Sequence, residues 1–122
     1  MFHIAKNGII TLTRGDTCSF PISLNIGTPL SPIIFDLQEG DKVVFKLMRA
    51  NEKSEDALLT KKYTINDLDE EGNIIVSFDS NDTLFLEDGV YFYEMKIEYI
   101  RNGNDFEYVN TFIPRTRFYI VN

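Results

Sequence analysis

The amino-acid sequence predicts an all-β protein, an antiparallel β-sandwich of about seven or eight strands with one short helical turn. Short segments alternate apolar and polar residues, turn-forming residues separate them, and no segment keeps helical periodicity beyond two turns. The chain has 122 residues, the usual size of one domain, so we expect a single domain over 1–122. Residues 1–8 are expected to form an N-terminal arm.

The clearest alternation runs over residues 17–26. One face of this segment is apolar and consists of Cys18, Phe20, Ile22, Leu24 and Ile26. Pro21 falls on the opposite face, and because proline cannot donate to a ladder, we expect an edge strand or a bulge here. A shorter strand over 9–13 precedes it.

The middle of the chain predicts three more strands and the helical turn. The strands expected here are residues 42–49, 58–64 and 73–78. Lys61 and Lys62 should protect the second of these strands as a sheet edge. Residues 33–37 are apolar but short, so a strand and a buried loop both stay open. Ser80 can cap a helical turn over 81–86.

The longest predicted strand covers residues 90–100. Its expected inner face consists of Tyr91, Tyr93, Met95, Ile97 and Tyr99. An Asn-Gly pair within 101–105 favours a tight hairpin turn after it. Return strands are expected over 106–112 and 117–121, with a break near Pro114.

Composition argues against several classes of function. The net charge is −7, whereas nucleic acids and anionic membranes bind clustered positive charge, so we expect neither as a partner. The chain has one cysteine, Cys18, and one histidine, His3, too few for a disulfide framework or a Cys/His zinc site. We expect no enzyme activity, no metal and no cofactor. Without a secretion signal, synthesis and retention in a cytoplasm are expected.

Two motifs imitate known binding sites, the integrin-binding tripeptide and the first half of a calcium-binding loop. Residues 14–16 spell Arg-Gly-Asp, which we interpret as a turn between the first two strands, with glycine at positive φ and Asp16 bonding local backbone amides. Asp67, Asp69 and Glu71 resemble half of a calcium loop. The twelfth position, which needs a bidentate glutamate, is Phe78, so a solvated acidic turn is the better interpretation.

Residues 86–93 have the layout of a tyrosine corner, in which a phenol at the start of a central strand bonds the backbone a few residues upstream. Glu87, Gly89 and Tyr91 occupy the acidic, small and tyrosine positions, and this stretch resembles the immunoglobulin-like pattern. It departs from antibody domains at Tyr93, where they have cysteine, and the chain has no tryptophan. The resemblance therefore concerns the sandwich architecture. The alternative is that Tyr91 is simply a core aromatic.

Three stretches, in order, carry a wider resemblance. They read ITLTRGDT at 10–17, LxxGDKVVF at 37–45 and LxxGxYxY at 86–93, and a final Phe118-x-Ile120 follows. Over residues 9–121 the chain resembles the N-terminal module of bacteriophage baseplate upper proteins and related immunoglobulin-like phage modules. The resemblance implies a β-sandwich that docks into a symmetric virion assembly, often as trimers, with no catalytic residues to carry over.

The resemblance implies a non-enzymatic structural or adaptor module of a bacteriophage or prophage virion, in tail, baseplate or head-surface assembly. Because family members continue into fibrous segments and this sequence stops at 122, we expect an accessory or adaptor rather than a receptor carrier. We expect synthesis in the bacterial host cytoplasm, virion proteins as partners, and either a homo-oligomer, trimeric or higher, or a symmetric assembly. The apolar residues exceed what one inner face needs, and soluble monomers seldom display large apolar patches. The candidate interface residues are Phe2, Ile4, Ile33, Ile34, Phe35, Val44, Phe92 and Ile100.

Two alternatives stay open. One is a carbohydrate- or peptide-binding module for host-surface recognition, which would need exposed aromatic residues in its loops. Only Phe35, Phe85 and Phe106 are candidates, and apolar neighbours suggest that each is buried. The other is a regulatory or inhibitor protein acting inside the infected cell.

Overall fold

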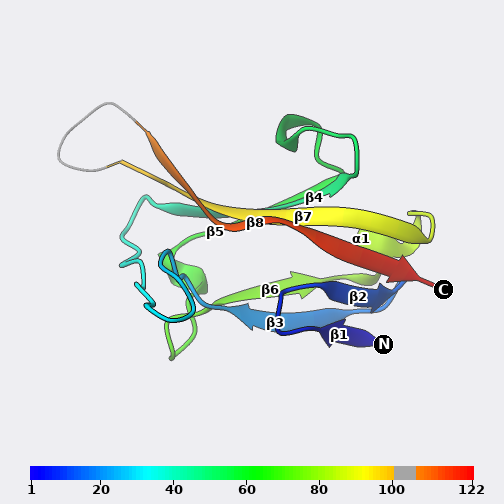
Figure 1. Ribbon diagram of the computed structural model, residues 1–122, viewed down its shortest axis with the longest axis horizontal. Coiled ribbons are helices and arrows are strands. Elements are labelled where there is room, and N and C mark those ends of the chain that lie inside the picture. Colours follow the sequence, from blue (N-terminus) through cyan, green and yellow to red (C-terminus); the bar gives the residue numbers. More distant parts are fainter. Residues whose placement is uncertain (101–106) are drawn as a thin grey trace.

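Eight strands and three short helical turns make up the part of the chain described by the computed structural model, residues 1–100 and 107–122 (Figure 1). The strands are β1 (Phe2–Ile4), β2 (Ile10–Thr13), β3 (Cys18–Ile22), β4 (Lys42–Arg49), β5 (Leu59–Tyr63), β6 (Ile74–Phe78), β7 (Gly89–Tyr99) and β8 (Tyr108–Val121). The helical turns are η1 (Ser54–Asp56), η2 (Ile65–Asp67) and α1 (Ser80–Leu84). The predicted all-β, sandwich-like class is confirmed. The turn expected within 101–105 lies outside the described residues.

The strands form a six-stranded sheet in the order β1-β2-β8-β7-β4-β5 and a two-stranded sheet, β3-β6. Figure 1 shows β4, β5, β7 and β8 in one layer, whereas β1 and β2 curl into the layer of β3 and β6. The predicted antiparallel pairing holds except between β2 and β8, which run parallel. These strands end together, where the Arg14 N–H donates to the Val121 carbonyl at 2.8 Å, and both termini lie at this end of the sandwich.

The N-terminal residues are a sheet edge rather than a free arm. Strand β1 pairs antiparallel with β2, with His3 opposite Thr11. The Phe2 ring stacks on the ring of Phe20 at 5.1 Å between centroids, which ties β1 to the neighbouring β3. Strand pairing and ring stacking therefore fix β1 against its neighbours.

Strand β3 has the predicted alternation and the predicted edge position. Its inward residues Phe20 and Ile22 are buried, as is Leu24 beyond its end, while Pro21 is exposed. Within the described chain β3 pairs only with β6, so the missing proline N–H leaves a strand that has a neighbour on one side.

Strand β5 is the predicted edge strand, and its two lysines protect it in different ways. Lys62 is exposed, whereas Lys61 points between the layers. Its ammonium pairs with the Asp82 carboxylate at 3.0 Å and lies 5.4 Å from the centre of the Phe78 ring. A charge directed inward at an edge opposes the addition of a foreign strand.

Strand β8 is one continuous strand where two were predicted. The break expected near Pro114 appears as register shifts against β7, between the pairs Tyr93–Thr116 and Lys96–Thr111. Proline cannot donate to the ladder, so pairing is lost locally while the strand continues. The helical turn also differs slightly, because its N-cap is Asp79, whose N–H donates to the Asp82 carboxylate, and not Ser80.

Four aromatic rings join the two layers at the centre of the core. Phe45 stacks on Tyr93 at 5.5 Å and meets Phe78 of the other sheet edge-on at 5.6 Å. Phe118 lies 5.5 Å from Phe78 and 6.2 Å from Tyr93. The Tyr93 hydroxyl donates to the Gly8 carbonyl at 2.5 Å, and burial raises the pKa of Tyr93 to about 12.

The raised pKa of Tyr93 predicts a loss of stability in alkali. The folded state favours the protonated phenol, and this contribution to stability is fully present below the ordinary pKa of 10.0. It is lost as the pH rises towards the folded-state pKa of about 12, because the unfolded chain releases the proton first. We expect the free energy of unfolding to fall by about 2 kcal/mol across this window. Urea unfolding from pH 9 to 12 measures it. Tyr93→Phe should reduce this slope without abolishing it, because burial also raises the pKa of Cys18 and of Tyr63, and an unchanged slope would contradict the assignment.

Candidate functional site

The metal-ligand and thiol chemistry of the described residues can be considered first. No group of three or more His, Cys, Asp or Glu among them could hold a metal ion. Cys18 is half-buried, and burial raises the pKa of its thiol, which disfavours the reactive thiolate. None of the helices in residues 1–100 and 107–122 combines the length and hydropathy needed to cross a membrane.

The Arg-Gly-Asp tripeptide forms the expected turn between β2 and β3. Gly15 adopts a φ of +81°, which favours glycine, and its N–H donates to the Thr83 hydroxyl at 2.9 Å. Arg14 pairs with the Asp88 carboxylate at 3.3 Å. Asp16 pairs with the ammonium of Met1, where local backbone amides were expected as its partners.

The calcium-like segment is a turn fastened by its own side chains. The Asp69 carboxylate accepts the N–H groups of Glu71 at 2.8 Å and Asn73 at 2.9 Å. Asp67 accepts the N–H of Thr64 at 2.7 Å and so caps the first turn of η2. The carboxylates of Asp67 and Asp69 therefore fasten the backbone of this turn.

The predicted interface residues do not gather on one surface. Phe2 lies inward against Phe20, and Ile4 is 38% exposed at the β1 edge. Val44 is a correction, because only 3% of it is exposed and it offers almost no surface to a partner. It lies in register with Lys62 and Lys96 on either side, and long lysine side chains cover apolar neighbours in this way.

Phe92 is partly covered from within the chain. The Arg115 guanidinium lies over its ring at 5.4 Å. The same guanidinium donates to the carbonyls of Arg49 at 2.8 Å and Ala50 at 3.2 Å. Arg115 therefore holds the loop after β4 against the outer face of the sheet and reduces the surface that Phe92 could offer.

The other predicted residues mark an exposed apolar hairpin, residues 24–35. Ile26 donates to the Ile33 carbonyl at 2.8 Å and Phe35 to the Leu24 carbonyl at 2.9 Å, so the two arms run antiparallel. Residues 33–35 are thus the return arm of a hairpin, and neither a full strand nor a buried loop. Ile100 lies near this end, since the ring of its neighbour Tyr99 contacts Phe35 at 4.9 Å.

Side-chain and backbone contacts hold the apolar hairpin in shape. The Asn25 side-chain oxygen accepts the N–H groups of Gly27 at 2.9 Å and Ile33 at 3.0 Å. Thr28 and Ser31 exchange backbone hydrogen bonds at its tip. A Cβ at Gly27 would meet the Ser31 carbonyl oxygen at 2.4 Å, so only glycine fits there.

Three large aliphatic side chains are exposed on this held hairpin. The exposed fractions are 98% for Leu30, 57% for Ile33 and 59% for Ile34. Alternation does not distinguish Leu30 in the sequence, and its position between Pro29 and Pro32 is the signal of an exposed tip. Soluble proteins seldom expose several large apolar side chains together, so this hairpin is the candidate contact surface of the described residues.

Phe85 corrects a second expectation. Its apolar neighbours suggest burial, but 83% of the residue is exposed just after α1. Figure 1 places α1 near the end of the sandwich that holds the termini, away from the apolar hairpin. Phe35 is half-buried, and Phe106 lies outside the described residues.

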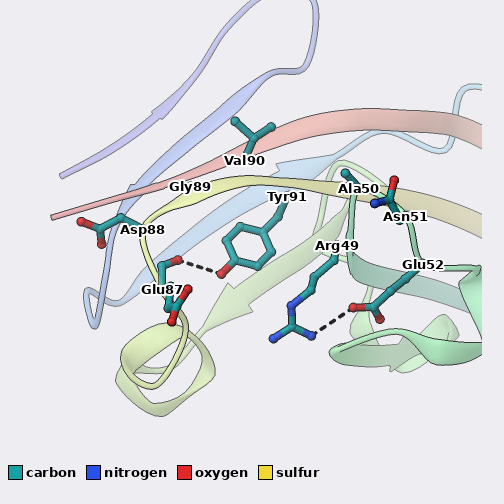
Figure 2. A pocket seen from close by; sticks show the side chains of 9 residues that line it. All are labelled: Arg49, Ala50, Asn51, Glu52, Glu87, Asp88, Gly89, Val90 and Tyr91. Atoms are coloured by element: carbon teal, nitrogen blue, oxygen red, sulfur yellow. Dashed lines mark hydrogen bonds and ion pairs between the residues drawn. The ribbon is translucent and has the colours of Figure 1, made fainter.

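An open groove of about 410 Å³ lies at this same end, between residues 49–52 and 87–91 (Figure 2). Tyr91 forms its floor, and its hydroxyl donates to the Glu87 carbonyl at 2.7 Å, the geometry of a tyrosine corner. Gly89 takes a φ of +152° between them. Arg49 pairs with Glu52 at 3.0 Å. Three carboxylates and one guanidinium line the groove, and Arg14 pairs with one of these carboxylates, Asp88, so the net negative charge of the lining is small.

Comparisons with protein-family models, with curated proteins and with solved structures found no match.

If Tyr91 is a true corner, Tyr91→Phe should lower the free energy of unfolding by about 1 kcal/mol, because the buried hydrogen bond to Glu87 is lost. Chemical denaturation measures this change. Tyr119→Phe, at a half-buried position on β8, is the matched control and should change stability by less than about 0.5 kcal/mol. Equal effects would favour the alternative that Tyr91 is only a core aromatic.

Asn25→Ala should loosen the apolar hairpin without unfolding the sandwich. We expect hydrogen exchange at the Gly27 and Ile33 amides to become about tenfold faster, since both lose their acceptor. Asn25→Asp keeps an acceptor oxygen and should retain most of the protection. Unchanged exchange in Asn25→Ala would show that other contacts hold the hairpin.

Proposed function

We propose that this protein is a non-enzymatic structural or adaptor module of a bacteriophage or prophage-derived particle, acting in tail, baseplate or head-surface assembly. The observation that carries the proposal is the apolar hairpin, which exposes Leu30, Ile33 and Ile34 on a backbone held in shape. The sequence resemblance to phage baseplate modules supplies the setting.

The hairpin supports a role in assembly for a physical reason. A contact loop that is already ordered loses little conformational entropy when it docks. Burial of its aliphatic side chains then contributes directly to association. A module of this kind acts by shape and burial, with other virion proteins as its partners and the virion as its location.

The exposed Phe85 favours host-surface recognition as a second candidate function. Phe85 precedes Glu87 of the groove by two residues, and an exposed ring could stack on a sugar or fill a peptide-binding site. The groove itself supplies no further ring, because Tyr91 is only 6% exposed. The small negative charge that remains on the lining suits a basic peptide better than a neutral sugar.

Quantitative mass spectrometry of purified phage particles tests the structural proposal. We expect the chain to be present at a fixed ratio to the major capsid protein, because an assembly component occupies symmetric positions. Its absence from particles, together with abundance in the infected-cell lysate, would contradict the proposal and favour an intracellular regulator.

Matched variants separate the two candidate functions in the same particles. Leu30→Ser should reduce incorporation about tenfold, because burial of one leucine contributes roughly 1.5–3 kcal/mol. Phe85→Ser removes a similarly exposed apolar residue at the other end and should be incorporated normally. Normal assembly of both variants with impaired host adsorption of Phe85→Ser would favour host recognition.

A further inference from the structure

Charge is distributed unevenly along the chain. A quarter of all residues are charged, yet none occurs between Asp16 and Asp36. This uncharged segment folds into β3 and the apolar hairpin that follows it. The gap in charge therefore coincides with an edge strand and with the hairpin that follows it along the chain.

The outer face of the two-stranded sheet is uncharged as well. Ser19 lies opposite Ser77, with their hydroxyl oxygens 3.0 Å apart, and Pro21 lies opposite Ile75. Both serines and the proline are exposed, and Ile75 is partly so. We call this face, together with the apolar hairpin, the neutral surface.

The outer face of the other sheet is highly charged. Its outward residues on β4, β5 and β7 include Lys42, Lys46, Lys62, Glu94, Lys96 and Glu98. Two of them, Glu94 and Lys96, pair at 3.4 Å. The two outer faces thus differ in kind, one carrying many ions and the other none.

We propose that the neutral surface is a self-association face, on which two copies of the chain pack back to back about a two-fold axis. Each copy carries a net charge of −7, so most contacts between copies would bring carboxylates together. The neutral surface avoids that repulsion. A basic partner would find no carboxylate on the neutral surface to pair with.

A two-fold contact also fits the distribution of apolar groups. Such an interface uses the same patch on both copies. Strands β3 and β6 would supply contact between small side chains, while Leu30, Ile33 and Ile34 of each hairpin lose their exposure to water. This self-association rests on the proposed function and deepens it, since it names a second copy as the partner of the contact surface.

Sedimentation equilibrium of the full chain up to high micromolar concentration tests this. We expect a monomer–dimer equilibrium that tightens as salt is raised, because salt screens the repulsion between two acidic copies. Leu30→Glu and Ser19→Glu should each raise the dimer dissociation constant at least about tenfold. Phe85→Glu and Thr60→Glu place the same charge on exposed sites elsewhere and should leave it unchanged.

Thermal unfolding of each variant checks that the fold is retained. Leu30 is 98% exposed, so its replacement should hardly affect folding. A strict monomer, a dimer weakened by salt, or equal effects of test and control variants would overturn the self-association face. The particle measurement is independent. Incorporation of a monomeric chain would leave the proposed function standing, and a dimer absent from particles would leave only the self-association.

Discussion

Contact between aromatic rings across the layers is the interaction on which the sandwich depends. Phe78 belongs to the two-stranded sheet, and a sheet of two strands is marginal in water unless it packs on another layer. Its ring meets Phe45 and Phe118, which belong to different strands of the larger sheet. The Tyr93 hydroxyl extends the cluster to Gly8 and so fixes the loop between β1 and β2.

With the core fixed in this way, the surface features follow from it. The apolar hairpin continues directly from β3, whose inward residues Phe20 and Ile22 anchor it to the core. Pro21, Ser19 and Ser77 lie on the neutral surface because successive side chains of a strand point to opposite faces and their neighbours point into the core. One face of β3 therefore packs in the core, and its opposite face belongs to the proposed contact surface.

The sequence predicted those elements whose residues alternate because one face is buried. The strand over 42–49 has the predicted bounds, and the inward stripe from Tyr91 to Ile97 is buried as expected. Alternation could not reveal exposure outside the core. Val44 points outward and is still buried between lysine neighbours, while Phe85 has apolar neighbours and is still exposed, since both depend on contacts distant in sequence.

The sequence also predicted the turns at Gly15 and Asp69, because glycine and aspartate favour turn conformations. Strand order was not, because the parallel pairing of β2 with β8 joins residues over a hundred positions apart. That pairing has a practical consequence for handling the molecule. Both termini lie at the end of the sandwich opposite the apolar hairpin. A tag or surface attachment at either terminus would therefore leave the hairpin facing the solution and accessible to a soluble partner.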